Sequence, residues 1–211
     1  MSTVRDEVTG VDSNSEGIEC LIEIVTQHED PKARLNAAYQ LAETKGQRAS
    51  SVFLGLLIDP NREMRYCAAL SLRKFPGASS VQALIQCVTT DADSDARKVA
   101  AYSLGCLRAR RGIVPLIQVM LNAEEEPEVR GQAAEALGMI RSRRGVSPLR
   151  KALSDPVIDV RYWAAFALGQ IGDPSAIPDL ERLAAEDKAV LDRWGSVRDE
   201  ALGALQNLVG G

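Results

Sequence analysis

The stretch DVRYWAAFALGQIG, residues 159–172, decides the fold because altered copies of it recur along the chain. The other copies begin near residues 32, 63, 95, 128 and 196, and all of them align on one arginine. These arginines are Arg34, Arg65, Arg97, Arg130, Arg161 and Arg198. Their separations of 31 to 37 residues are typical of stacked-repeat proteins, in which each unit packs against its neighbours.

The second half of each repeat carries a helical pattern. With the repeat arginine as position 0, position +3 is Ala and position +7 is Leu in all six copies. Spacings of three and four residues lie on one helical face, and the repeated Ala allows neighbouring backbones to approach closely. Gly105, Gly138 and Gly169 occupy position +8, where we expect them to loosen the end of this second helix.

The first half of each repeat predicts a shorter amphipathic helix, as at residues 113–121, 146–153 and 176–185. Pro115 and Pro148 fall in the first turn of such helices, where the missing N–H group is tolerated. Acid-proline pairs, such as Asp155-Pro156, separate the first helix from the second. Each repeat is therefore expected to fold as two helices.

This pattern resembles the HEAT repeat family, and specifically its short bilin-lyase-type repeats, whose units read roughly L…L.D.d..VR..AA.ALG.ig. The resemblance implies an all-α, right-handed α-solenoid of about six HEAT-like repeats in one domain, residues 18–208. The repeats lie near 18–45, 48–75, 79–108, 112–141, 145–172 and 175–208. Residues 1–17 are polar and are expected to be disordered. The sixth unit has six added residues and is expected to act as a C-terminal cap.

Composition and charge argue against several classes of function. The net charge is −4 and the pI about 5.2, which argues against a nucleic-acid or anionic-membrane partner, although a local basic patch stays open. No apolar run approaches the ~20 residues of a membrane helix, and we expect a cytoplasmic protein. The four cysteines form no CxxC pair and fall within helical patterns, so we interpret them as buried or half-buried thiols. His28 is the one histidine. We therefore expect no metal, no cofactor and no catalytic residue.

Aromatic residues gather at two positions of the second helices. The second helices of HEAT arrays line the concave side, so the resemblance makes positions +1 and +5 candidates for binding. All four tyrosines of a chain with 4% aromatic residues fall in these two columns. Tyr and Trp are favoured at interfaces, although the rings could instead fill gaps between helices. The predicted protein-binding residues are Tyr39, Tyr66, Tyr102, Glu135, Tyr162, Trp163 and Phe166.

Charge is sorted between the two kinds of loop. Loops inside repeats are acidic and loops between repeats are basic, so stacking predicts one acidic edge and one basic edge. Complementarity to helix dipoles accounts for this sorting, and gripping an acidic partner or phosphates is the functional alternative. The repeat arginines are expected to pair with loop acids of their own or a neighbouring unit. The candidate basic edge consists of Arg108, Arg110, Arg111, Arg141, Arg143 and Arg144.

These patterns favour a non-catalytic scaffold or adaptor that binds another protein through its concave face. The resemblance also implies one enzymatic alternative, a lyase subunit that attaches or detaches an open-chain tetrapyrrole on an antenna protein. Under that alternative the aromatic face would hold the bilin and the basic edge would meet its propionates.

Overall fold

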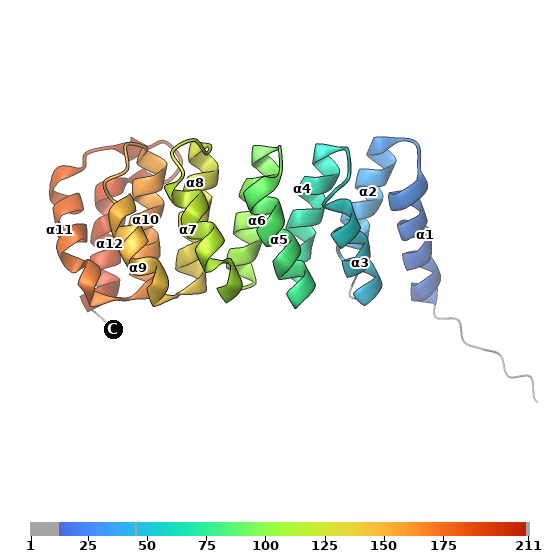
Figure 1. The fold of residues 1–211 in the computed structure, drawn as a ribbon, viewed down its shortest axis with the longest axis horizontal. Helices are drawn as coiled ribbons and strands as arrows, with labels where there is room; N and C mark the ends of the chain where they lie inside the picture. Colours follow the sequence, from blue (N-terminus) through green and yellow to red (C-terminus); the bar gives the residue numbers. More distant parts are fainter. Residues whose placement is uncertain (1–12, 45, 210–211) are drawn as a thin grey trace, which may run out of the picture.

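In the computed structural model, which describes residues 13–44 and 46–209, twelve α-helices alternate between two parallel rows (Figure 1). The first helices are α1 (Ser13–Gln27), α3 (Gln47–Leu56), α5 (Ala78–Thr90), α7 (Ile113–Leu121), α9 (Val146–Ala152) and α11 (Ile177–Glu186). The second helices are α2 (Pro31–Leu41), α4 (Arg62–Ser71), α6 (Ser94–Cys106), α8 (Pro127–Ile140), α10 (Ile158–Ile171) and α12 (Val197–Val209). The predicted all-α solenoid is confirmed.

Short 3-10 helices join several repeats: Leu72–Lys74, Arg110–Gly112, Arg143–Gly145 and Pro174–Ala176. Loops inside repeats lie along the upper edge of Figure 1, and loops between repeats lie along the lower edge. Of the N-terminal segment predicted to be disordered, residues 1–12 lie outside the described residues and residues 13–17 begin α1. No described helix combines the length and hydropathy needed to cross a lipid bilayer.

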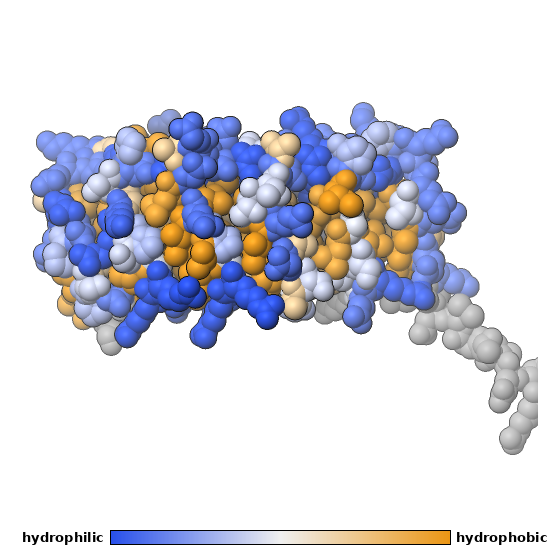
Figure 2. Space-filling model, viewed as in Figure 1, coloured by the Kyte–Doolittle hydropathy of each residue, from blue (hydrophilic) through white to orange (hydrophobic). Residues whose placement is uncertain are grey.

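The core lies between the two helix rows and uses the predicted columns. Every Ala at position +3 is buried, from Ala37 at 4% exposure to Ala201 at 0%. The Leu at position +7 is buried in the first five repeats, whereas Leu205 of the last repeat is half-buried. Figure 2 shows the face of the first helices, where hydrophobic side chains lie between strongly hydrophilic edges. The repeated small and aliphatic residues therefore form one continuous core.

The glycines at position +8 bring second helices into backbone contact, so the expectation that they loosen helix ends is wrong. A Cβ on Gly138 would lie 2.7 Å from Cα of Ala167, and one on Gly169 would lie 2.8 Å from Cα of Ala204. A Cβ on Gly105 would meet Cα of Ala136 at 3.0 Å. Each glycine removes the side chain that would separate its helix from the next one, and α8 and α10 continue past it.

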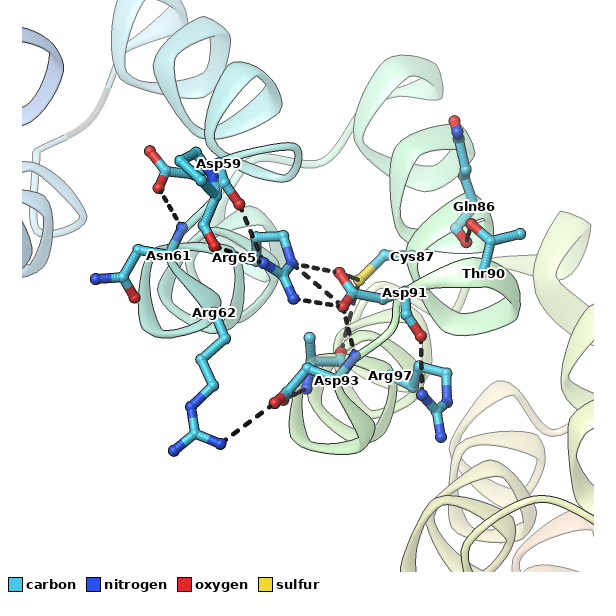
Figure 3. A network of polar contacts seen from close by, with 12 residues as sticks. Asp59, Asn61, Arg62, Arg65, Gln86, Cys87, Thr90, Asp91, Asp93 and Arg97 are labelled. Atoms are coloured by element: carbon cyan, nitrogen blue, oxygen red, sulfur yellow. Dashed lines mark hydrogen bonds and ion pairs between the residues drawn. The ribbon is translucent and has the colours of Figure 1, made fainter.

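The first five repeat arginines form a ladder along the acidic edge, and each of these five pairs with an acid of the following repeat. Arg65 Nε donates to Asp91 Oδ2 at 2.9 Å, and Arg65 Nη1 donates to the Asp59 carbonyl oxygen at 3.1 Å (Figure 3). Asp91 Oδ1 also accepts from the Asp93 amide at 2.9 Å, which closes the turn between α5 and α6. The five pairs are Arg34–Asp59, Arg65–Asp91, Arg97–Glu125, Arg130–Asp155 and Arg161–Asp187.

The added residues of the sixth repeat fold into a β-hairpin that the sequence did not predict. Strands β1 (Val190–Leu191) and β2 (Gly195–Ser196) pair antiparallel, with Val190 opposite Ser196. Gly195 has φ 95°, a left-handed conformation that glycine adopts without steric cost. The hairpin contacts α10 and directly precedes α12, so it packs against the last two second helices described.

Candidate protein-binding surfaces

Two surfaces hold the predicted site residues, and the first is the second-helix face, the exposed side of α2, α4, α6, α8, α10 and α12. Successive second helices contact each other extensively, whereas successive first helices touch at few residues. Closer spacing on one side makes a stacked array curve toward that side. The packing is therefore consistent with the second-helix face as the concave one.

The N-terminal part of this face contains a hollow of about 410 Å³. Tyr39 is 46% exposed and Tyr66 is half-buried, and both rings line the hollow from neighbouring helices. Burial raises the pKa of Tyr39 above its ordinary value, so its hydroxyl stays protonated at neutral pH. The residues lining the hollow are Leu35, Tyr39, Arg62, Glu63, Tyr66, Asp93 and Asp95.

Charges around the hollow are partly neutralised within the protein. Arg62 Nη1 lies 3.7 Å from Asp93 Oδ2, and Lys98 Nζ donates to Asp95 Oδ1 at 2.8 Å. The hydrogen bond from Lys98 holds the pKa of Asp95 below its ordinary value. Glu63 makes no ion pair among the described residues, so its carboxylate is available to a ligand in the hollow.

The centre of the second-helix face carries a half-buried carboxyl group. Glu135 lies on α8, and the side-chain amide of Gln132, one turn earlier, donates to it. Burial raises the pKa of Glu135, while the Gln132 hydrogen bond opposes that rise. On the neighbouring α6, contact with Cys106 raises the pKa of the Tyr102 hydroxyl. The sequence placed Tyr102 and Glu135 in adjacent units of one column, and they lie on adjacent helices.

The C-terminal part of the face is an aromatic cluster centred on Trp163. Its ring meets Tyr162, Phe166 and Trp194 edge to face, with centroids 5.3, 5.5 and 5.3 Å away. Its Cδ1 atom would also touch a Cβ on Gly131 at 3.0 Å, so the missing side chain on α8 makes room for the indole. Edge-to-face pairs add to the stability of such a cluster beyond simple burial.

Tyr162 differs from the other predicted binding residues because it is only 8% exposed. Its hydroxyl donates to the carbonyl oxygen of Trp194 at 3.1 Å, which fastens the hairpin to α10. Burial, with nearby Glu200, raises its pKa to about 12. Tyr162 thus packs inside the protein, whereas Tyr39, Tyr66, Tyr102, Trp163 and Phe166 are exposed or half-buried.

The second surface is the basic edge, which lies in the turns between repeats. Arg108, two residues after the end of α6, and Arg141, directly after α8, adopt left-handed conformations with φ 47° and 54°. Arg141 Nη2 donates to Gln170 Oε1 at 2.9 Å, and Arg143 Nε lies 3.6 Å from Asp173 Oδ2. The basic edge and the arginine ladder therefore lie on opposite edges of the solenoid.

Sequence reasoning missed several residues that the structure adds to these surfaces. Trp194, 52% exposed, joins the aromatic cluster from the hairpin, and the Trp194-Gly195 pair inside the added segment was the available signal. Arg62, Asp93 and Asp95 reach the N-terminal hollow from the starts of α4 and α6. They stand outside positions +1 and +5, so the column pattern did not select them.

Two of the four thiols, those of Cys67 and Cys87, are not activated nucleophiles. Cys67 and Cys87 are buried, and burial raises their pKa values to about 11 and about 12. Both thiols are therefore protonated at neutral pH, and the thiolate is the reactive form. Cys20 is exposed on α1, contrary to the interpretation of all four cysteines as buried or half-buried.

A sequence model of HEAT repeats matches residues 18–105 and 113–206. The chain belongs to the HEAT repeat family. No curated protein matches the sequence.

Solved structures with a similar fold include the complex of CpcE and CpcF of phycocyanin lyase from Nostoc sp. PCC7120. It shares 23% identity with this chain at a TM-score of 0.65, over 98% of this chain and 82% of the other. A designed armadillo repeat protein in complex with the peptide (KR)4 shares 18% identity at a TM-score of 0.62, over 90% and 99%. An engineered protein shares 24% identity at a TM-score of 0.61, over 92% and 96%. These similarities support the solenoid fold.

Proposed function

We propose that this HEAT repeat protein is a non-catalytic scaffold that binds an extended segment of another protein along its second-helix face. The observation that carries the proposal is the distribution of aromatic side chains. Five of the predicted residues are accessible along one face, from Tyr39 near one end to Phe166 near the other. Aromatic side chains supply large, rigid contact areas and dominate the energetics of many protein interfaces.

The shape of the face also supports an extended partner. The hollow beside Tyr39 and Tyr66 accepts a side chain, and the half-buried Glu135 offers a hydrogen-bond acceptor at the centre. The cluster around Trp163 offers an apolar contact at the far end. A segment that crosses these three places would contact several repeats at once, which suits a preformed solenoid surface.

Peptide selection tests the proposal directly. Peptides displayed on phage are selected on the immobilised protein, and their dissociation constants are measured by calorimetry. The double variant Tyr66→Ala/Tyr102→Ala should weaken binding by about tenfold or more, since aromatic interface residues often contribute 1–2 kcal/mol each. The control is Ile58→Ala/Val114→Ala, which removes apolar groups that are 85% and 45% exposed, in the turn after α3 and on α7. Equal affinity for both variants would overturn the proposal.

A bilin lyase-type subunit is the second candidate function. The aromatic cluster of Trp163, Phe166 and Trp194 favours it, because such rings can pack against a flat conjugated ligand. Titration with phycocyanobilin, followed by its absorption spectrum, separates the two candidates. A saturable shift that is lost in Trp163→Ala would support the lyase, and an unchanged spectrum would leave the scaffold.

A further inference from the structure

The basic edge contains a duplicated sequence. RARRG, residues 108–112, and RSRRG, residues 141–145, occupy the same place in two adjacent repeats. The first runs from the end of α6 to the start of α7, and the second runs from the end of α8 to the start of α9. Both turns lie on the lower edge in Figure 1, and strongly hydrophilic side chains follow that edge in Figure 2.

Helix dipoles do not explain four of these arginines. Arg110 and Arg111 belong to a 3-10 helix that leads directly into α7, and Arg143 and Arg144 lead into α9. A helix N-terminus carries partial positive charge, so cations are disfavoured there. The corresponding turn before α11 consists of Pro174–Ala176, which holds no arginine. The fold therefore forms this turn without basic residues.

The remaining two arginines occupy a backbone position that suits glycine better. Arg108 and Arg141 have positive φ, and the corresponding residue of the next repeat is Gly172, with φ 74°. A side chain in the left-handed region is strained, whereas glycine adopts it freely. Residues that keep such strain are often functional, so the arginines at these positions call for an explanation beyond stability.

The guanidinium groups of this edge are largely unpaired. Arg143 alone of the six has a carboxylate within ion-pair distance in the described part of the chain, and its side chain is still 84% exposed. The acids of the opposite edge instead pair with the repeat arginines, as Asp155 does with Arg130. The protein thus presents a local positive surface despite its net charge of −4.

We propose that the basic edge binds an acidic segment of a partner protein, rich in Asp and Glu. Arginine forks match carboxylates in paired hydrogen bonds. Packed helices lie ~8–10 Å apart, and an extended chain rises ~3.3 Å per residue, so carboxylates about three residues apart would meet successive turns. Nucleic acid fits less well, because residues 108–112 and 141–145 contain no aromatic ring on which a base could stack.

The first experiment measures binding of a fluorescein-labelled deca-glutamate peptide by anisotropy. The peptide should bind the protein, and affinity should fall between ~50 and ~200 mM salt because exposed charges are screened. Arg110→Gln/Arg111→Gln/Arg144→Gln should weaken binding about tenfold, from several modest exposed ion pairs. Lys32→Gln/Lys151→Gln/Lys188→Gln makes the same charge change at exposed residues near the acidic edge and should leave affinity nearly unchanged.

Three outcomes would overturn the proposal: absence of peptide binding, equal losses in the two triple variants, or stronger binding of a ten-nucleotide oligothymidylate than of deca-glutamate. The last result would assign the edge to nucleic acid. Binding by the Tyr66→Ala/Tyr102→Ala protein should match the wild type, so failure here is separate from failure of the proposed function.

A second variant separates binding from folding. Arg108→Gly/Arg141→Gly places glycine at the two left-handed positions, so the melting temperature should be retained or should rise. Deca-glutamate affinity should nevertheless fall severalfold, because two guanidinium groups are lost. A lower melting temperature together with unchanged affinity would show that the two arginines serve the fold, and would contradict their part in the proposed site.

Discussion

The two ends of the solenoid use different solutions for stacking second helices. In the C-terminal repeats, α8 and α10 have 14 residues each and continue past Gly138 and Gly169. In the N-terminal repeats, α2 and α4 have 11 and 10 residues and end before position +8, which is Ala42 or Arg73. A glycine at this one position therefore accompanies a longer and closer helix contact.

The N-terminal repeats leave space where the C-terminal repeats are in contact. A cavity of about 870 Å³ opens at the lower edge, between the turn that joins the first two repeats and the turn that joins the second and third, and Ala42, Lys74 and Phe75 are among its lining residues. Lys74 spans part of it, donating to the Ala42 carbonyl oxygen at 3.2 Å and to Glu43 at 2.8 Å. Stacked repeats of nearly the same sequence can thus differ in packing through a few substitutions at helix ends.

Loss of one ladder arginine should be the largest effect and should be greater in the closely packed half. The Arg130 side chain is 6% exposed and the Arg34 side chain is 19% exposed, so truncation of Arg130 loses more buried contact. Their partners Asp155 and Asp59 are both nearly buried, at 10% and 6%. Arg130→Ala leaves a nearly buried carboxylate without its partner, so we expect a loss of about 3–5 kcal/mol in urea unfolding. Arg34→Ala should cost less.

Arg198 provides the control for the ladder. It is exposed, and no carboxylate lies within ion-pair distance of it among the described residues. Arg198→Ala should change stability by no more than about 0.5 kcal/mol. Equal losses in Arg130→Ala and Arg198→Ala would contradict a stabilising role for the pairs.

A side chain at position +8 should disrupt the C-terminal contact. Gly138→Val adds a branched side chain where a Cβ alone would lie 2.7 Å from the Ala167 backbone. Because backbone cannot move as easily as a side-chain tip, we expect a loss of about 3 kcal/mol by urea unfolding. Wild-type stability in this variant would show that the close helix contact is not needed.

Lowering the pH should change the contributions of two carboxyl groups to the stability of the solenoid in opposite directions. Burial opposes ionisation of Asp91, but the hydrogen bonds from Arg65 and the Asp93 amide outweigh it and hold its pKa below 3.8. Its contribution to stability is therefore present above the unfolded value and is lost as pH falls through the lower folded value. Burial instead raises the pKa of Glu135 above 4.5, so its ionisation costs stability at neutral pH.

Melting temperatures measured from pH 7 to pH 3 check these signs. Asp91→Asn should melt lower than the wild type at pH 7, and the difference should shrink as the pH falls below about 4. Glu135→Gln should melt at or above the wild type at pH 7, and the difference should shrink as the pH falls through the raised folded pKa and disappear below the unfolded value of about 4.5. A variant pair that shifts in the same direction at pH 7 would contradict this assignment.

Apart from the Arg198 control, the smallest expected effect is a gain in stability. A Cβ on Gly55 of α3 would meet nothing within 4 Å, in contrast to one on Gly138. Gly55→Ala should stabilise the protein by about 0.5–1 kcal/mol, because alanine loses less conformational entropy in a helix. Urea unfolding again gives the value, and a loss instead of a gain would mean that an unrecognised constraint acts at this position.

Most of the fold follows from features that act locally or repeat. Position +3 is small and position +7 is Leu in every unit, so helix period and stacking could be inferred without coordinates. The sequence also predicts that the repeat arginines pair with loop acids of their own or a neighbouring unit. Five of the six do so, each with an acid of the following unit. Repetition made these inferences reliable, because six copies of one pattern share one geometry.

The remaining features depend on contacts between units, which the pattern of one unit does not contain. Gly138 is interpretable only beside Ala167 of the next helix, and Tyr162 is buried only because the hairpin brings Trp194 over it. The column analysis therefore selected Tyr162 as readily as Tyr66. The binding roles assigned to the exposed residues of the second-helix face and to the basic edge stay predictions.

The ion pairs of the ladder all run in the same direction along the chain. Each internal unit offers an arginine to the unit that follows and a carboxylate to the unit that precedes, as Asp91 and Arg97 show within one repeat. Copying such a unit in frame would reproduce both halves of its junctions, so tandem duplication could lengthen the protein without inventing a new interface.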